Sequence, residues 1–189
     1  MVSTLDTTAQ TTDTAATWQI DAGHSLVEFA VKHMMFTTTK GRFGQFSGTI
    51  AYDEADASRS AVAVEIDTVS VDTRDEKRDD HLRSGDFFDS ERFPTITFTS
   101  TRVEPTGDDS FRVAGDLTIR GITRPAVLDA EFTGRGTNPW GQEVIGFSAT
   151  TKFKRSEFDL EWNAALETGG VLVGDEVKIS LEIEAGKQA

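Results

Sequence analysis

The sequence predicts an all-β fold in which eight antiparallel strands form one domain. Three observations lead to this prediction. From Trp18 onward apolar and polar residues alternate with a period of two, turn-forming residues separate the alternating stretches, and the strand–helix–strand order of parallel sheets is missing. Such strands can close into a barrel or pack as a sandwich, and closure is favoured because it removes exposed sheet edges.

The alternation defines each predicted strand in turn. Val62, Val64 and Ile66, for example, share one face of their stretch, while the residues between them are charged or small. This is typical of an antiparallel strand with one buried and one solvent-facing side. The eight stretches are 26–32, 41–52, 61–68, 95–99, 111–120, 126–133, 144–154 and 177–184. Gly107, Gly121 and Asn138-Pro139 fall between stretches, where hairpin turns need them.

The stretch 41–52 is proline-free, and at ~3.3 Å per residue it would extend on the order of 40 Å. A barrel built on such a strand suits a long ligand. Phe43 and Phe46 lie out of phase with one another, and Gly44 and Gly48 indicate a bulge or a close backbone approach. The sequence leaves open which of the two rings faces inward.

One segment breaks the strand pattern. The run from Thr73 to Glu76 forms a capping box, charged helix-forming residues follow to Arg83, and Gly85 can end the helix. We therefore expect a short charged helix over about 73–84. Its only large apolar side chain is Leu82, so the helix should lie solvated across an end or a flank of the sheet.

Composition excludes several classes of function. The 189 residues contain 19 Lys and Arg against 32 Asp and Glu, a formal net charge of −13, which disfavours nucleic acid as a partner. No apolar run approaches the ~18 residues of a membrane-spanning helix, so an integral membrane protein is not expected. Because the chain has no cysteine, it can form neither disulfides nor thiolate metal sites.

The domain boundaries follow from the same pattern. We expect a disordered, Thr-rich N-terminal tail at 1–16, a barrel domain at 17–185 and a short C-terminal tail at 186–189. The first residues lack the basic region and the apolar run of a secretory signal, so a cytoplasmic protein is expected. The oligomeric state stays open, with a homodimer as one alternative.

Motifs for catalysis are absent from the sequence. The spacing of His24, His33 and His81 fits no zinc motif, and no nucleophile elbow, phosphate loop or dinucleotide fingerprint occurs. We expect His24 to hydrogen-bond to backbone where a strand begins and His81 to pair with carboxylates. This favours binding over catalysis, without a metal or cofactor; an enzyme with His24 or His81 as general base is the alternative.

The aromatic residues predict an apolar interior. The chain has 13 Phe and 3 Trp but only 1 Tyr, and most rings fall on the inward side of the predicted strands. An eight-stranded barrel is wide enough either to be filled by its side chains or to hold one slender ligand, and both alternatives stay open. Met34, Met35 and Phe36 form a run suited to an adaptable apolar rim.

The residues also carry a resemblance that covers the chain from Trp18 to Ile183. It rests on these motifs: Trp18-x-Ile20-Asp21-x-x-His24-Ser25-x-Val27-x-Phe29-x-Val31-Lys32-His33-Met34, Gly41-x-Phe43-x-x-Phe46-x-Gly48, Arg78-Asp79-x-His81-Leu82-Arg83-Ser84-x-Asp86-Phe87-Phe88-Asp89, Phe93-Pro94-x-Ile96-x-Phe98, Gly115-x-Leu117-Thr118-Ile119-x-Gly121-Ile122-Thr123-Arg124-Pro125 and Arg155-Ser156-Glu157-Phe158. In these motifs the sequence resembles the YceI family of bacterial polyisoprenoid-binding proteins. It departs from the family at Asp159, where a glycine is common, and in lacking the secretory signal of several members.

The resemblance implies an extended, lipocalin-like barrel that encloses a long apolar chain, such as a polyprenyl phosphate, a quinone or a similar amphiphile. We expect the chain to carry or sequester this lipid, without catalysis. The alternatives are an enzyme acting on a bound lipid and a ligand-free stress or interaction module with a filled barrel. The residues expected to contact ligand are Phe29, Val31, Phe98, Leu117, Ile119, Phe132, Phe147 and Phe153 along the lining, and Met34, Met35, Phe36 and Trp162 near an opening.

Overall fold

The computed structural model describes residues 15–167 and 169–188. Within these residues the chain forms one antiparallel sheet of 11 strands and one α-helix. The strands are β1 (Ala16–Ile20), β2 (Leu26–His33), β3 (Thr37–Phe43), β4 (Phe46–Tyr52), β5 (Ala61–Asp67), β6 (Val71–Asp72), β7 (Thr95–Pro105), β8 (Ser110–Ile119), β9 (Ile122–Thr137), β10 (Glu143–Lys154) and β11 (Val173–Lys187). The helix is α1 (Glu76–Arg83), and short 3₁₀ turns lie at Ala57–Arg59, Thr68–Ser70 and Arg155–Phe158.

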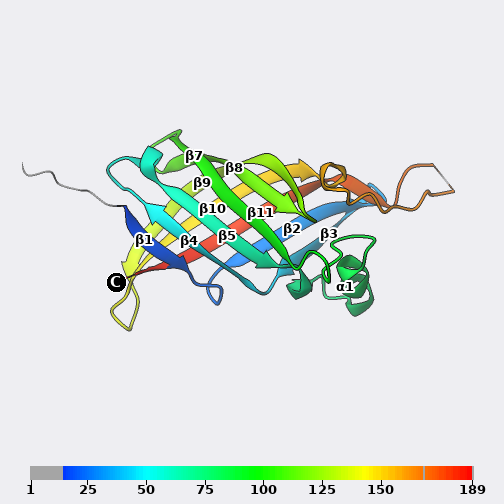
Figure 1. The fold of residues 1–189 in the computed structure, drawn as a ribbon, viewed down its shortest axis with the longest axis horizontal. Helices are drawn as coiled ribbons and strands as arrows, with labels where there is room; N and C mark the ends of the chain where they lie inside the picture. The colour runs from blue at the N-terminus through cyan, green and yellow to red at the C-terminus, as the bar shows by residue number, and fades with distance from the viewer. Residues whose placement is uncertain (1–14, 168, 189) are drawn as a thin grey trace, which may run out of the picture.

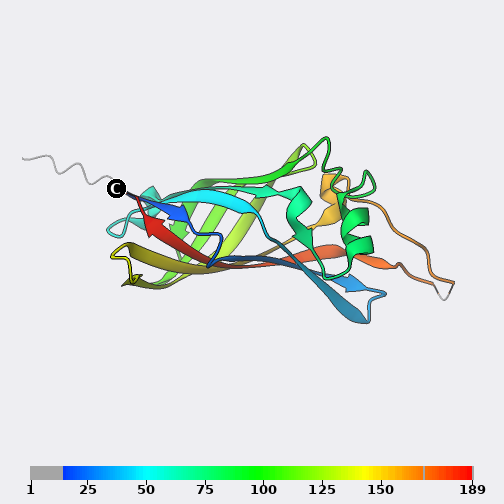
Figure 2. The same cartoon turned by 90° about the horizontal axis from the view of Figure 1, so that it is seen from below.

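The sheet closes through its last strand. β11 pairs with β10 along one edge; along the other edge it pairs first with β2, where Ile179 faces Phe29, and then with β1, where Ala185 faces Ile20. The strands β1, β4, β5, β7, β8, β9, β10 and β11 thus form a ring, and β2, β3 and β6 extend from it. The predicted eight-stranded antiparallel barrel is confirmed, and it is elongated (Figures 1 and 2).

The predicted strand 41–52 is in fact two strands, β3 and β4. The chain breaks at Gly44 and Gln45, where the Gly44 amide donates to the Ser70 carbonyl at 3.1 Å and the Gln45 carbonyl accepts from the Asp67 amide at 2.9 Å. This break resets the alternation between the strands. Phe43 and Phe46 therefore both face the interior, which the sequence left undecided.

The helix lies across one end of the barrel, as expected, but its cap differs from the prediction (Figures 1 and 2). Asp75 is the N-cap and accepts from the Arg78 amide at 3.2 Å. Thr73 cannot be the cap because Arg74 adopts a left-handed conformation with φ of 62°. Thr73 instead donates its amide and hydroxyl to the buried Asp79 carboxylate, at 2.8 and 2.6 Å. The helix ends before a C-cap at Ser84, one residue ahead of Gly85.

The barrel extends slightly beyond the predicted boundaries. β1 begins at Ala16 and β11 continues to Lys187, so both ends of the described chain pair in the sheet. Of the disordered tail expected at 1–16, residues 1–14 lie outside the described residues, whereas Ala16 begins β1. Within the described chain, no helix has the length and apolar character needed to cross a membrane.

Candidate functional site: an apolar cavity inside the barrel

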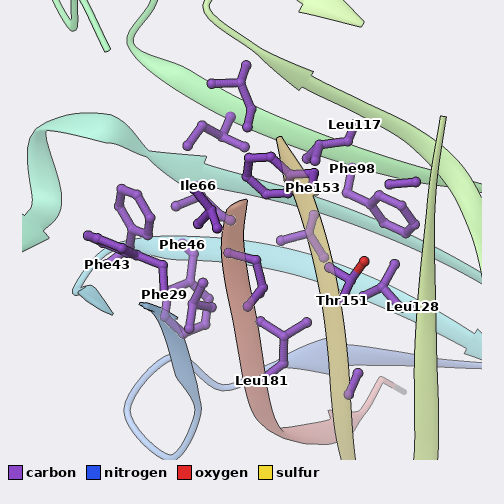
Figure 3. Close-up of a pocket in the computed structure, with 18 of the residues that line it drawn as sticks. Phe29, Phe43, Phe46, Ile66, Phe98, Leu117, Leu128, Thr151, Phe153 and Leu181 are labelled. Atoms are coloured by element: carbon purple, nitrogen blue, oxygen red, sulfur yellow. The ribbon is translucent and has the colours of Figure 1, made fainter. Parts of the chain in front are cut away.

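A cavity of about 480 Å³ runs through the interior of the barrel. Its wall follows the alternation of the strands: β10 contributes Phe147, Ala149, Thr151 and Phe153, every second residue. Figure 3 shows side chains from several strands converging on this space, among them Phe29, Phe98 and Leu181. The volume lies within the range of about 300–1,000 Å³ typical of pockets that enclose small-molecule ligands.

The burial pattern shows that the interior is hollow. Phe29, Leu128, Phe153 and Leu181 face inward, yet each is only half-buried. In a filled core, inward-facing aromatic and aliphatic side chains would be buried completely by their neighbours. Here their remaining accessible surface forms the cavity wall, so the filled-core alternative does not describe this barrel.

An aromatic plug, defined by Tyr52, Phe111, Phe132 and Phe147, lies at one end of the cavity. The Tyr52 ring lies 6.4 Å from Phe111, 5.8 Å from Phe132 and 5.4 Å from Phe147, measured between ring centroids. Burial raises the pKa of the Tyr52 hydroxyl, so this group is neutral at physiological pH. Three of these rings, Tyr52, Phe132 and Phe147, pack on the cluster of the buried Trp18.

Polar side chains gather at the other end, next to α1. His81 lies between the rings of Phe87 and Trp162, at centroid distances of 5.0 and 4.6 Å, and its Nε2 is 2.9 Å from Asp86 Oδ2. Arg78 also borders the cavity and donates its Nε to Thr73 Oγ1 at 2.7 Å. The cavity is thus apolar along its length and polar at one end.

Arg155 organises the backbone at this polar end. It is buried, and its guanidinium donates to the carbonyls of Gly174 at 2.9 Å, Trp162 at 3.0 Å and also Leu160. Burial lowers the pKa of Arg155 from its ordinary value, while these carbonyls satisfy its donors. Its role is to hold the segment that carries Trp162 against β11.

The structure brings most of the predicted lining residues together. Eight of them border the cavity: Phe29, Val31, Phe98, Leu117, Ile119, Phe147, Phe153 and Trp162. Phe132 does not border it; its ring stacks on Tyr52 within the aromatic plug. Met34, Met35 and Phe36 lie outside the wall, and Met35 and Phe36 are 60% and 80% exposed. Contact of any of these residues with a ligand stays a prediction.

Sequence reasoning overlooked several wall residues. Phe46, Leu128 and Leu181 line the cavity, and all three lie in stretches that were predicted as strands (Figure 3). Leu128 and Leu181 could have been found by extending the alternation along their strands. Phe46 could not, because its orientation depends on the break before β4.

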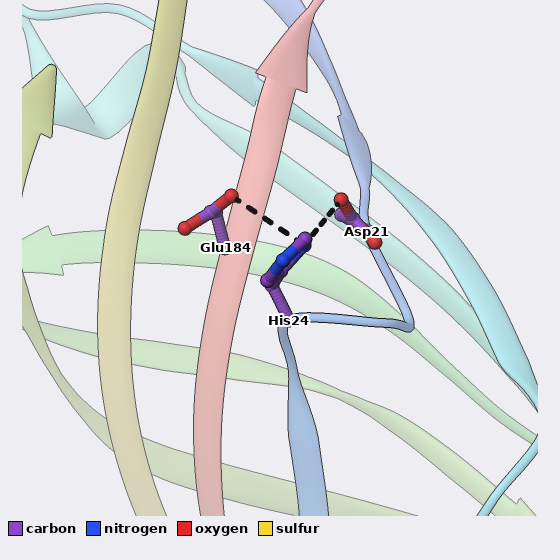
Figure 4. Close-up of side chains that lie close together, drawn as sticks. All are labelled: Asp21, His24 and Glu184. Atoms are coloured by element: carbon purple, nitrogen blue, oxygen red, sulfur yellow. Dashed lines mark hydrogen bonds and ion pairs between the residues drawn. The ribbon is translucent and has the colours of Figure 1, made fainter. Parts of the chain in front are cut away.

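A second cluster lies outside the cavity, at the corner between β1 and β2 (Figure 4). His24 Nδ1 is 2.9 Å from Asp21 Oδ2 and 4.0 Å from Glu184 Oε1, and the three ligand atoms lie within 4.8 Å of one another. The hydrogen bond between the His24 ring and the Asp21 carboxylate raises the pKa of His24 and lowers that of Asp21. The His24 ring therefore pairs with a carboxylate rather than with backbone, whereas the His24 amide does hydrogen-bond to backbone, donating to the Asp21 carbonyl at 3.2 Å.

This cluster fixes a corner of the barrel. The Asp21 amide donates to the Glu184 carbonyl at 2.9 Å, and Ser25 Oγ accepts from the Glu184 amide at 2.9 Å. Three ligand atoms of this kind could coordinate a divalent cation, but Asp21 and His24 already hydrogen-bond to each other. His24 lies outside the cavity wall, whereas His81 borders it.

The fold and the cavity define the class: a closed antiparallel barrel with an apolar interior, the lipocalin-like architecture. Residues 18–185 match the family described as the YceI-like domain. The chain belongs to this family, and the resemblance inferred from its motifs is confirmed.

Individual relatives agree with this assignment. UPF0312 protein VVA0736 of Vibrio vulnificus (strain YJ016) is 43% identical over 148 residues, which cover 77% of this chain and 78% of the relative. The crystal structure of BcnA from Burkholderia cenocepacia matches with a TM-score of 0.77 and 28% identity over 87% of this chain and 98% of BcnA. A polyisoprenoid binding domain from Saccharophagus degradans shares the fold, with a TM-score of 0.68 and 18% identity over 93% of this chain and 99% of that domain. None of these names states a catalytic activity.

Proposed function

We propose that this protein binds a long-chain lipid of isoprenoid type inside the barrel and carries or sequesters it. The hollow apolar interior is the observation that supports this function most directly. Each methylene moved from water into such a space contributes about 0.8 kcal/mol. A few isoprene units can therefore offset the entropic cost of association without an ionic contact.

The two ends of the cavity favour an amphiphile, such as a polyprenyl phosphate or a quinone. The aromatic plug presents rings, with the neutral Tyr52 hydroxyl as its one polar side-chain group, whereas Arg78 and His81 supply polar groups at the other end. The fold shared with a polyisoprenoid binding domain is consistent with this ligand class. No cofactor or metal has a part in the proposal.

The test is to identify what the protein retains. The chain is purified without detergent, its apolar contents are extracted, and mass spectrometry should detect a long-chain lipid. Purified protein stripped of lipid should then take up a prenyl quinone or a prenyl phosphate. Recovery of no apolar molecule together with no uptake of either probe would falsify the proposal.

Catalysis on the bound lipid is the second candidate, and one observation favours it. His81 borders the cavity and pairs with Asp86 at 2.9 Å, which is the arrangement of an oriented base. An enzyme of this kind would convert the bound lipid and lose that activity in His81→Gln. A carrier returns its lipid chemically unchanged, so product analysis after prolonged incubation separates the two candidates.

The cytoplasmic location and the homodimer stay predictions, and each can be tested by a simple measurement. Fractionation of cells tests the cytoplasmic location, and light scattering of the purified protein tests whether it forms a homodimer.

A further inference from the structure

Three of the exposed large apolar side chains among the described residues lie at one end of the barrel. Met35 and Phe36 are on the turn between β2 and β3, and Val171 is on the segment before β11. The two segments are joined, because the Met34 amide donates to the Leu172 carbonyl at 2.8 Å. We call these five residues, Met34, Met35, Phe36, Val171 and Leu172, the apolar tip.

The backbone of the apolar tip is strained. Met34 and Met35 both have positive φ, 51° and 62°, and the turn closes with the Phe36 amide donating to the His33 carbonyl at 3.1 Å. Turns of this kind favour Asn and Gly, because a side chain with a Cβ crowds the following carbonyl. Methionine is an unfavourable residue for both positions of this turn, and the largely exposed Met35 side chain also lowers solubility. Such a combination is expected where function requires it.

The charge around the apolar tip differs from the rest of the molecule. The chain has 32 acidic residues, yet none lies between 29 and 52, a segment that contains Lys32, His33 and Lys40. Lys40 pairs with Glu28 at 2.7 Å, whereas Lys32 has no ion-pair partner among the described residues. Although the protein as a whole is acidic, the turn between β2 and β3 carries no negative charge that would repel an anionic surface.

The apolar tip is continuous with the cavity. Lys32, His33 and Leu172 belong to the cavity wall, so the base of the turn borders the space proposed for the lipid. The aromatic plug lies at the opposite end.

From these observations we infer that the apolar tip docks on a lipid bilayer and places the neighbouring end of the cavity at the membrane surface. The inference rests on the proposed lipid-binding function and adds the surface from which the lipid is exchanged. Flexible thioethers and a Phe ring suit the fluid boundary between headgroups and acyl chains. Because Glu167 lies on the neighbouring segment, the apolar contribution should exceed the electrostatic one.

The experiment measures sedimentation of the full chain with phosphatidylcholine vesicles, with and without phosphatidylglycerol. Wild type should bind both vesicles, and the anionic ones a few-fold more tightly. The double variant Met35→Ser/Phe36→Ser should bind both kinds of vesicle at least about ten-fold more weakly, because two apolar side chains no longer enter the interface. Trp140→Ser is the matched control: Trp140 is 82% exposed on the β9–β10 loop, which lies beside the end of β11, and its loss should leave binding unchanged (Figure 1).

A second variant separates docking from folding. Met34→Asn/Met35→Gly supplies the residues that the left-handed turn favours, so it should unfold at a higher temperature than wild type while it binds vesicles several-fold more weakly. Unchanged vesicle binding in this more stable variant would contradict the inference.

The remaining outcomes are also decisive. The inference is overturned if wild type binds neither vesicle, if the double variant binds like wild type, or if Trp140→Ser loses binding. It is also overturned if wild type is a dimer that the double variant dissociates, because the tip would then contact a second copy. Uptake of a prenyl quinone added from a water-miscible solvent is measured in parallel. Uptake by wild type without vesicle binding would contradict only the docking inference. Absence of uptake would contradict the lipid-binding function itself.

Discussion

At the scale of single residues, the direction of a side chain decides its effect on the cavity. Ala149 lies on the inward face of β10, opposite Ala130 of β9 and Leu181 of β11, and the next residue, Thr150, is exposed. The small size of Ala149 and Ala130 keeps this part of the interior open. A larger side chain at position 149 would therefore occupy the cavity rather than displace a packed neighbour.

Ala149→Phe should therefore weaken uptake of a prenyl quinone about ten-fold or more, because the new ring occupies the path of the hydrocarbon chain. Fluorescence titration with the quinone measures the change, and thermal unfolding checks that the variant folds. Thr150→Phe adds the same ring on the outward face and should bind like wild type. Equal loss in both variants would show that the cavity wall has been assigned to the wrong face.

The histidine at the β1–β2 corner predicts a pH dependence. Its Asp21 partner raises the pKa of His24 above the ordinary 6.5, so the stabilising contact is fully present below pH 6.5 and is lost as the pH rises through the raised pKa. At the acid side the contact is lost as Asp21, whose pKa lies below 3.8, becomes protonated. NMR titration of the His24 ring should give a pKa above 6.5 in wild type and a lower one in Asp21→Asn. An identical pKa in both proteins would exclude the Asp21 carboxylate as the cause.

At the scale of elements, α1 depends on one buried carboxylate more than on its charged surface. Asp79 accepts two hydrogen bonds from Thr73, and Arg78 donates to the same Thr73 hydroxyl. Asp80, the next residue, is 71% exposed and pairs only with Arg83 among the described residues. The helix is thus fixed through Thr73 at its first turn, and at its last turn Arg83 donates to the carbonyls of Val69 and Val71 at 2.9 and 3.0 Å.

Asp79→Ala should lower the free energy of unfolding by roughly 2–4 kcal/mol, because it leaves the Thr73 donors without a partner in a buried site. Asp80→Ala should cost about 0–1 kcal/mol, as expected for an exposed ion pair. Urea unfolding of the two variants measures both values. A cost for Asp79→Ala no larger than that for Asp80→Ala would mean that α1 is not held through Thr73.

At the scale of the whole molecule, the hollow barrel lacks apolar contacts that a filled core would have. A bound lipid supplies them, and a ligand that binds only the folded state stabilises it by about 2.7 kcal/mol at about one hundred times its Kd. Differential scanning calorimetry should therefore show a rise in Tm with increasing prenyl quinone for wild type. Ala149→Phe should show little rise, and an equal rise in both would place the binding outside the cavity.

Local sequence patterns were enough to predict which residues can share a face. Period-two alternation placed Phe98, Leu117 and Phe153 on the interior side, and the same pattern covered Leu128 and Leu181. The charged helix was also readable from its sequence, apart from the exact cap. These features are local, because they depend on residues a few positions apart.

Whether the interior is filled or hollow became evident only in the folded barrel. That depends on how far inward-facing side chains on opposite walls lie from one another, which the number and tilt of the strands fix and no local pattern records. The same reason explains why two of the predicted contact residues do not border the cavity. Phe132 has the expected alternation but lies where the rings of the aromatic plug meet, and Met35 lies beyond the end of β2 in an exposed turn. Closure of β11 on β1 joins residues more than 160 positions apart, and it creates the space in which a ligand can lie.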